Sequence, residues 1–155
     1  MASILQKAQN LCLRLGPPSP WLDPICAYGM GGDATTEPPI GDCSWFAAAC
    51  CGQSKVDAEG RWWNTDRIYA DATGSHKRWR QIQAPVPGCI GVYPGKTVAG
   101  KRHAGHVWIV DDPKRAATIE CSSTGIGVNS LRRPGWFKPG AKGNGHAIIW
   151  AEFVG

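Results

Sequence analysis

The chain has 155 residues, which is enough for one domain with a hydrophobic core and too short for two domains of ordinary size. Hydrophobic residues make up 43% and charged residues 19%, and this balance excludes an intrinsically disordered polyampholyte. The net charge of +5 suits an anionic surface, but the basic residues are scattered and accompany no nucleic-acid-binding motif, so we expect no nucleic-acid partner.

Helical patterns come first along the chain. Residues 3–15 carry an apolar stripe at helical spacing and predict the first helix. Residues 42–51 predict a second helix, which has Asp42 as its N-cap and Gly52 as its C-terminal stop. This second segment is apolar on every side, as expected for a helix buried at the centre of a fold. A third helix is predicted over residues 61–72.

Strand patterns follow after residue 85. They predict strands over residues 89–93, 106–110, 117–121 and 145–154. The short turn between the second and third of these strands predicts an antiparallel hairpin. Helices followed by antiparallel strands predict one α+β domain over residues 1–155, with the N-terminal helices packed on a central antiparallel sheet.

Cys43 differs from the other cysteines of the chain. The sequence contains seven Cys, an odd number, without C-x-x-C pairs or zinc-ligand spacing, so we expect no metal and no cofactor. Most of these cysteines adjoin apolar or small residues and are typical of buried side chains. Cys43, however, follows the N-cap of the predicted buried helix. Backbone N–H groups and the helix dipole favour the nucleophilic thiolate there.

A cysteine nucleophile needs a base, and the base needs an acceptor that orients it. His106 opens an apolar strand, where the backbone holds it rigidly at the end of a sheet, and His146 is the alternative in a similar place. Glu120 lies in the middle of the next predicted strand, where a carboxylate requires a partner. Asp111, in the turn after the His106 strand, is the alternative acceptor.

Four segments stand in an order that resembles a known family. They are Tyr28-Gly29-Met30-Gly31-Gly32, Asp42-Cys43-Ser44, Gly105-His106-Val107 and Ile119-Glu120-Cys121-Ser122-Ser123-Thr124-Gly125. Together they resemble the NlpC family, papain-like cysteine peptidases that cut bacterial peptidoglycan. The resemblance runs from about residue 25 to residue 131 and implies a papain-like NlpC fold. It implies a cysteine endopeptidase that cleaves the D-glutamyl–diaminopimelate bond of the stem peptide.

The resemblance also implies catalytic roles. Cys43 would attack the scissile carbonyl, His106 would act as general base and then acid, and Glu120 would orient His106. The sequence departs from the family at Trp45, where Gly is usual, so that this ring must turn into the core or narrow the cleft. Glu120 is a second departure, since His is common at its place. The related CHAP amidases use Cys, His and Glu in this order, and they cut between muramic acid and L-alanine.

Substrate-binding roles follow from the same resemblance. The Tyr28 hydroxyl would help to bind the oxyanion or the substrate, and Asp42 and Ser44 would lie beside the cleft that binds the stem peptide. The backbone N–H of Cys43 or Ser44 would complete the oxyanion hole. The Tyr-x-x-Gly-Gly and Ser-Ser-x-Gly elements favour NlpC over CHAP. A papain-like acyltransferase or lipid hydrolase is a further alternative, because the eight Trp permit an apolar acyl groove.

The sequence also bears on location and partners. No stretch approaches the roughly eighteen apolar residues of a membrane span, and polar residues interrupt the segment 4–15 where a secretory signal would lie. We therefore expect a monomer made in the cytoplasm without a signal peptide. It would act on bacterial peptidoglycan, in the wall or periplasm, after lysis or delivery. Such a protein is a phage endolysin or a secreted effector, and an effector would have a cognate inhibitor or immunity protein.

Overall fold

The computed structural model describes residues 2–14, 27–28, 40–54, 56–122 and 127–155. Its helices are α1 (Ile4–Arg14), α2 (Cys43–Cys50), α3 (Thr65–Ala70), the π-helical turn η1 (Asp71–Ser75), and the 3-10 turns η2 (Pro113–Arg115) and η3 (Pro134–Phe137). Its strands are β1 (Ala27–Tyr28), β2 (Ile40–Gly41), β3 (Trp79–Ile82), β4 (Ile90–Tyr93), β5 (Lys96–Val98), β6 (Lys101–His103), β7 (His106–Asp112), β8 (Ala117–Ser122), β9 (Gly127–Arg132), β10 (Lys142–Gly143), β11 (His146–Ala147) and β12 (Ile149–Phe153).

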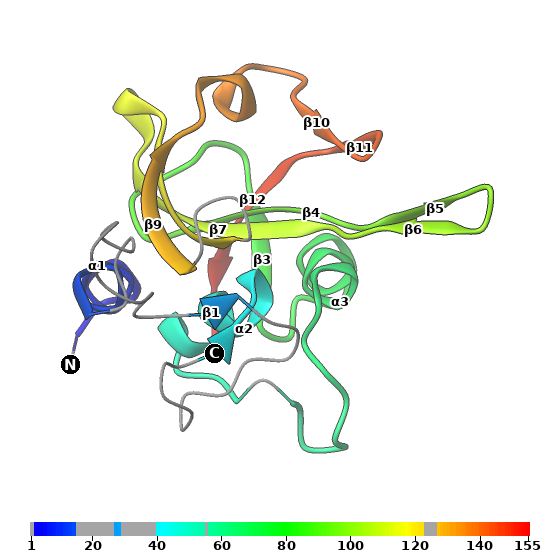
Figure 1. Ribbon diagram of the computed structural model, residues 1–155, viewed down its shortest axis with the longest axis horizontal. Coiled ribbons are helices and arrows are strands. Elements are labelled where there is room, and N and C mark those ends of the chain that lie inside the picture. Colours follow the sequence, from blue (N-terminus) through cyan, green and yellow to red (C-terminus); the bar gives the residue numbers. More distant parts are fainter. Residues whose placement is uncertain (1, 15–26, 29–39, 55, 123–126) are drawn as a thin grey trace.

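A six-stranded antiparallel sheet forms the centre of the molecule (Figure 1), in the order β3-β12-β4-β7-β8-β9. The C-terminal strand β12 therefore lies between β3 and β4. Strands β7 and β8 pair directly, with Ile109 opposite Ile119, which confirms the predicted hairpin. Helices at one end of the chain and an antiparallel sheet at the other confirm the predicted α+β class.

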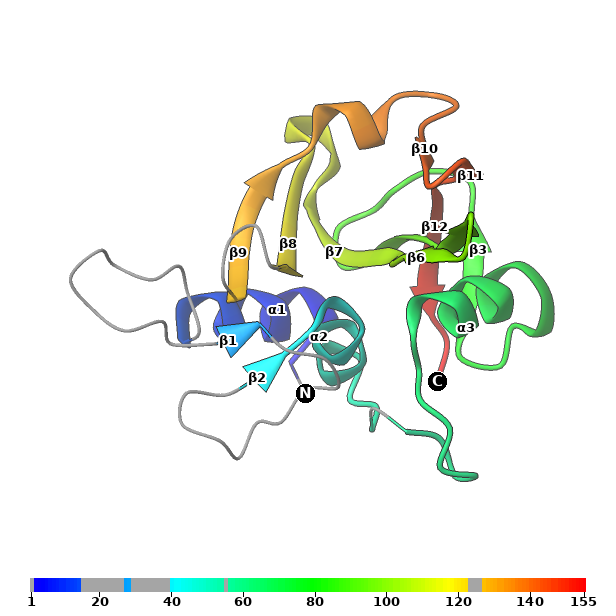
Figure 2. The ribbon, with the colours of Figure 1, turned by 45° about the vertical axis from the view of Figure 1, so that its right-hand side comes forward.

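Figure 2 shows helices on one side of the sheet, and the main core lies between them and that face. Phe46 and Ala47 of α2 and Ile68 of α3 pack there with no exposed surface, in one cluster with Val107 and Ile109 of β7. Helix α2 is buried because its side chains are apolar all round, and Gly52, with φ of 68°, allows the chain to turn away after it. The nucleophile candidate at the start of α2 is thus carried by a helix that is buried in the main core.

The other face of the sheet carries a second core, which is mainly aromatic. Trp108 and Val110 alternate with Val107 and Ile109 along β7, so the two pairs point to opposite faces. Trp136 of η3 packs on Trp108 with ring centroids 4.2 Å apart. This second cluster surrounds the start of β7, where His106 lies.

Two predicted elements differ from the structure. The third helix begins at Thr65 instead of residue 61, because Asn64 supplies the N-cap by accepting a hydrogen bond from the Arg67 N–H. The last strand is interrupted, since β11 pairs with β10 in a separate hairpin before β12 joins the sheet. Strands β3 and β9 were not predicted, because Arg80 and Asn129 break up their apolar patterns.

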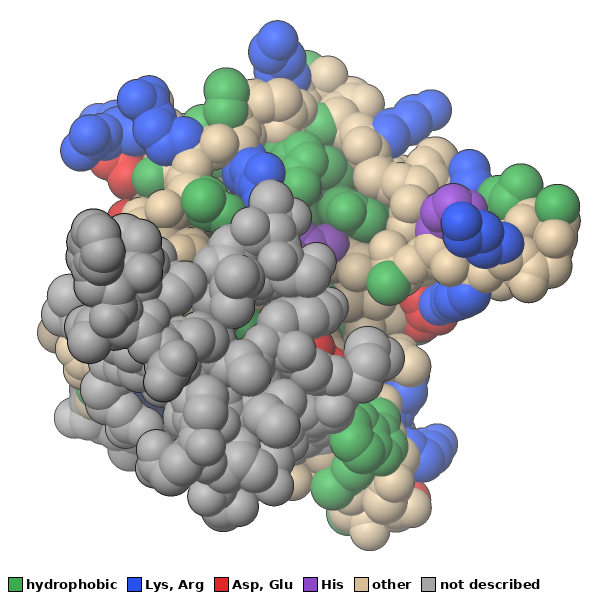
Figure 3. Space-filling model, viewed as in Figure 1, with side chains coloured by type: hydrophobic (Ala, Val, Ile, Leu, Met, Phe, Trp, Pro, Cys, Tyr) green, Lys and Arg blue, Asp and Glu red, His purple; other side chains and the backbone are tan. Residues whose placement is uncertain are grey.

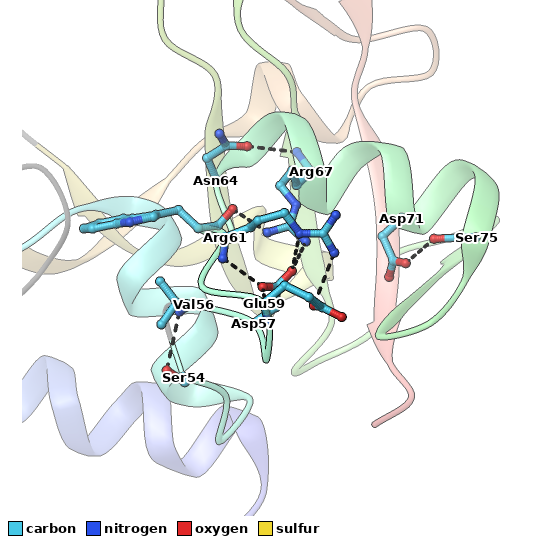
Figure 4. A network of polar contacts seen from close by, with 10 residues as sticks. Ser54, Val56, Asp57, Glu59, Arg61, Asn64, Arg67, Asp71 and Ser75 are labelled. Atoms are coloured by element: carbon cyan, nitrogen blue, oxygen red, sulfur yellow. Dashed lines mark hydrogen bonds and ion pairs between the residues drawn. The ribbon is translucent and has the colours of Figure 1, made fainter.

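The loop between α2 and α3 is fixed by a carboxylate network (Figure 4). Asp57 accepts hydrogen bonds from the Arg61 backbone at 2.8 Å, from Arg61 Nε at 3.0 Å and from Arg67 Nη2 at 2.6 Å. Asp71 accepts hydrogen bonds from the Arg78 and Trp79 backbone N–H groups, both at 2.8 Å. A cavity of about 560 Å³ lies beside this network and not at Cys43. These contacts stabilise the loop between α2 and α3 and the start of β3.

A two-stranded ribbon, β5–β6, extends from β4 and β7 beyond the body of the molecule (Figure 1). All of its residues are exposed, and Lys, Arg and His side chains gather on it (Figure 3). Asp66 of α3 fixes the base of the ribbon by accepting a hydrogen bond from the Gly95 N–H at 2.8 Å and by forming an ion pair with Arg102.

Among the described helices, none is both long and apolar enough to cross a membrane.

Candidate active site

Cys43 is the first residue of α2, and Asp42 is the N-cap of that helix. The Asp42 Oδ1 accepts hydrogen bonds from the Trp45 N–H at 2.7 Å and from the Ser44 hydroxyl at 3.0 Å. Asp42 and Ser44 are both buried, and Cys43 is 7% exposed. The partly buried Trp45 ring packs against the main core, so it turns inward, one of the two orientations expected for it. The sulfur thus stands at the positive end of a rigid, capped helix.

His106 is the first residue of β7 and lies opposite Tyr93 of β4 in the sheet register. Its Nε2 is 2.8 Å from Glu120 Oε1, and its ring also lies within hydrogen-bonding reach of the Cys43 thiol. Since Nε2 is bound to the carboxylate, Nδ1 is the nitrogen that remains for the sulfur. The structure therefore brings Cys43, His106 and Glu120 into one continuous chain of contacts.

Glu120 has no exposed surface, and several donors satisfy its carboxylate. Besides His106, it accepts hydrogen bonds from the Thr118 hydroxyl on the same strand and from Arg133, whose Nε is 3.0 Å from Oε2 and whose Nη2 is 3.3 Å from Oε1. A buried carboxylate is stable when it is paired with cations and hydrogen-bonded in this way. The carboxylate lies between two basic side chains.

These contacts fix the charges of the site. Burial alone would lower the pKa of His106, but its interactions with Cys43 and Glu120 outweigh burial and raise that pKa from 6.5 to about 9. Burial favours neutral Glu120, but the hydrogen bonds from His106 and Arg133 prevail and lower the pKa of this carboxyl group. At neutral pH the site therefore contains an imidazolium next to a carboxylate, and this imidazolium lies within hydrogen-bonding reach of Cys43.

Aromatic rings enclose His106 on the sheet face that carries the second core. Its ring stacks on Trp108 with centroids 5.8 Å apart and an interplanar angle of 30°. Trp136 and Tyr93 lie 5.7 Å and 6.4 Å from it, centroid to centroid. The side chain of His106 is 14% exposed as a result. The rings hold the imidazole in one orientation and keep most water from its ion pair.

The alternative residues lie elsewhere. His146 is exposed in the β10–β11 hairpin, where its ring contacts Tyr69 with centroids 6.3 Å apart. Asp111 lies near the far end of β7, about 16 Å along the strand from His106 at the usual rise per residue, and accepts a hydrogen bond from Gln9. Among the described contacts, neither residue meets Cys43 or Glu120.

The remaining predicted residue, Tyr28, is only partly described. Its backbone in β1 pairs in parallel with β2, opposite Gly41, so it runs beside the residues that lead into α2. Its side chain lies outside the described part of the structure. Among the residues that the structure describes, no group of three His, Cys, Asp or Glu side chains is arranged to hold a metal ion.

Arg133 and Trp136 belong to the site but were not predicted from the sequence. The guanidinium of Arg133 lies over the Trp136 ring, 4.7 Å from its centroid. Both residues follow β9 in a Pro- and Gly-containing segment that has no strand or helix pattern of its own. The sequence did contain one signal for such a partner. Glu120 is an isolated carboxylate in a predicted apolar strand, and a carboxylate buried there requires a cationic partner.

The comparisons with known proteins agree with this geometry. A family model described as the CHAP domain matches residues 32–124, more than half of the chain, and this segment contains Cys43, His106 and Glu120. No curated protein and no solved structure matches the chain. The match agrees with the Cys, His, Glu order of the CHAP amidases, and it does not confirm the resemblance to NlpC in particular.

Proposed function

Because the chain belongs to the CHAP domain family, we propose that it is a cysteine-dependent hydrolase that cleaves an amide bond of bacterial peptidoglycan. The family match supports peptidoglycan hydrolysis by an amidase or a peptidase. The observation that carries the proposal is the contact chain in which His106 joins the buried Glu120 to the thiol at the start of α2. This is the arrangement that nucleophilic catalysis by a thiol requires.

In the proposed reaction the Cys43 thiolate attacks the scissile carbonyl carbon, and the carbonyl electrons move to its oxygen. The backbone N–H of Cys43 or Ser44 is the expected donor to this oxyanion, since Asp42 already accepts from the Trp45 N–H. When the tetrahedral intermediate collapses, the C–N bond breaks and the His106 imidazolium gives its proton to the leaving amine. Water then attacks the thioester while His106 takes a proton from it. The C–S bond breaks, so that the carboxylic product leaves and Cys43 is again a thiolate beside the His106 imidazolium. Glu120 orients His106 throughout.

The bond that is cleaved is a finer proposal. We place the amide between muramic acid and L-alanine first, because the family match is to the CHAP domain and the Cys, His, Glu order is that of the CHAP amidases. The D-glutamyl–diaminopimelate bond is the second candidate, since the Tyr28–Gly32 and Ser122–Gly125 segments resemble NlpC. The two bonds leave different products, so one digestion separates them.

The test is digestion of purified diaminopimelate-type peptidoglycan, with the fragments identified by mass spectrometry. Free stem peptides that begin at L-alanine would support the amidase, and fragments ending in D-glutamate would support the endopeptidase. Cys43→Ala and His106→Ala should abolish release while the fold is retained. His146→Ala, at an exposed position, should release fragments at nearly the normal rate and serves as the matched control. Intact wall with the unaltered protein would refute the proposal and direct attention to acyl or lipid substrates.

We propose further that the chain is made in the cytoplasm and acts on the wall after lysis or delivery, as an endolysin or an injected effector does. Expression in the cytoplasm of a bacterium should then be tolerated, whereas export with a fused signal peptide should lyse the cells. Exported Cys43→Ala protein is the control and should be harmless. Lysis by that variant would show that the damage does not come from hydrolysis.

A further inference from the structure

Glu120 is bound by more than the histidine it is expected to orient. Arg133 meets both of its oxygens, with Nε 3.0 Å from Oε2 and Nη2 3.3 Å from Oε1. The carboxylate is fully buried, whereas the side chain of Arg133 is 30% exposed. Arg133 therefore lies between the buried carboxylate and the solvent, and its Nη2 contacts Oε1, the oxygen that also binds His106.

The position of Arg133 is fixed by contacts on both its backbone and its side chain. Its N–H donates to the Ala116 carbonyl at 2.8 Å, next to the start of β8, the strand that carries Glu120. Its guanidinium lies 4.7 Å from the centroid of Trp136, and Trp136 stacks in turn on Trp108. A planar, forked cation held in this way suits two-point binding of a carboxylate. Arg133 also lies outside the segment matched by the family model, which ends at residue 124.

We propose that Arg133 is a positioning residue of the catalytic site, which keeps Glu120 ionised and its Oε1 directed at His106, so that the thiolate–imidazolium pair persists in mildly acidic conditions. The inference rests on the proposed function for the roles of Cys43, His106 and Glu120. It assigns a second cation to the site, and this cation comes from a segment beyond the matched domain. The pH range in which the site works depends on this cation.

The sign of the effect follows from the groups around the carboxylate. Four polar or titratable groups from the surrounding elements face the Glu120–His106 pair. They are the Cys43 thiol from α2, the Tyr93 hydroxyl from β4, the Thr118 hydroxyl from β8, and Arg133 after β9. In addition, Asn129 of β9 lies opposite Glu120 in the sheet register. Arg133 is the only one of these that is cationic independently of His106. Without it, Glu120 loses two hydrogen bonds and a permanent positive charge while it stays buried. Its pKa then rises, and a protonated carboxyl no longer stabilises the imidazolium.

The experiment follows the pH dependence of Cys43 alkylation by iodoacetamide, with the modified peptide identified by mass spectrometry. This readout reports the thiolate–imidazolium pair and requires no substrate. The variants are Arg133→Gln, which removes the charge, and Arg133→Lys, which keeps the charge but not the fork. Arg132→Gln is the matched control, since Arg132 is an exposed neighbour whose Nε contacts a carbonyl at the end of η2. Wall lysis is measured over the same pH range.

Arg133→Gln should move the acid limb of the alkylation profile, and that of lysis, upward by about one pH unit or more, as expected when a carboxylate loses an adjacent cation. Arg133→Lys should move it by less, and Arg132→Gln should leave it in place. Superimposable profiles for all of these proteins would overturn the inference, even if Arg133→Gln were less stable. If Arg133→Gln does not fold, the comparison of Arg133→Lys with Arg132→Gln decides. A shifted alkylation profile in a protein that does not attack peptidoglycan would refute the proposed function alone.

Discussion

Glu120→Gln is the substitution that tests the electrostatics of the site most directly. The side chain keeps its shape, but the carboxylate that holds His106 at 2.8 Å becomes a neutral amide. His106 then loses the partner of its imidazolium, and Arg133 faces an uncharged group. Removal of one member of a buried ion pair is strongly destabilising, because the remaining charge stays away from water without compensation.

The structure gives the size and the pH range of this effect. The pKa of His106 is raised from 6.5 to about 9, an interval worth about 3 kcal/mol at ~1.4 kcal/mol per pH unit. A raised pKa contributes stability that is fully present below pH 6.5 and is lost as the pH rises through about 9. Cys43 and Glu120 share this net contribution, and because burial opposes it, their interactions with His106 together supply more than about 3 kcal/mol.

The assay is urea unfolding of the unaltered protein and of Glu120→Gln at intervals from pH 6 to 10, under reducing conditions. The difference in unfolding free energy should be largest near pH 6 and should decrease toward pH 10. Wall lysis at neutral pH should fall by about tenfold or more, because the imidazole is no longer oriented. Glu152→Gln is the control, since Glu152 forms an exposed ion pair with Arg80 and should matter little. A stability difference that does not change with pH would refute this account of the His106 pKa.

Three further predictions concern the helix, the sheet and the ribbon. Asp42→Ala should lower the free energy of unfolding by about 1 kcal/mol, measured by urea unfolding, because α2 loses its N-cap. Gly91→Ala should lower it by about 1–3 kcal/mol, because the new methyl group overpacks the core; its Cβ would lie 2.3 Å from the buried Trp108 ring. Lys96→Gln combined with Lys101→Gln should reduce sedimentation of the protein with insoluble peptidoglycan, and added salt should abolish the difference.

Each of these three has a control. Asp42→Asn keeps a capping oxygen and should retain most of the stability. Gly135→Ala adds a methyl group where nothing lies within 4 Å and should leave the unfolding free energy within about 0.5 kcal/mol. Lys114→Gln combined with Arg115→Gln removes the same charge from η2, away from the ribbon, and should leave sedimentation unchanged. Equal loss from both double variants would mean that net charge, and not the ribbon, determines wall binding.

The fold was predictable where local pattern and burial coincide. Helix α2 combines an N-cap, a terminal glycine and an apolar surface, and β7 with β8 combines alternation and a short turn. The position of β12 between β3 and β4 was not predictable, because strand order depends on pairing across most of the chain. The ribbon β5–β6 was missed for a different reason. Its exposed, largely polar residues carry no apolar pattern, and only pairing between its strands defines it.

The three residues proposed as catalytic could be selected from the sequence because each occupies a place that is unusual for its type. Cys43 stands at a helix start, His106 at the first residue of an apolar strand, and Glu120 inside another such strand. Arg133 shows no such contrast, since it is one of 17 basic residues and lies in an irregular segment. Arg133 lies beside β8 because the chain turns back after β9, where the Arg133 N–H donates a hydrogen bond to the Ala116 carbonyl.

The aromatic residues explain why these charged groups can act together. Trp108 and Trp136 lie beside His106 and stack on each other with centroids 4.2 Å apart. Charges interact more strongly where water is excluded, but an isolated charge there is costly, so exclusion helps only if every charge has a partner. His106 has Glu120, and Glu120 has Arg133, whose guanidinium reaches the solvent across the Trp136 ring. The aromatic rings exclude water from the site, and Arg133 supplies the charge that this exclusion makes necessary for the buried Glu120 carboxylate.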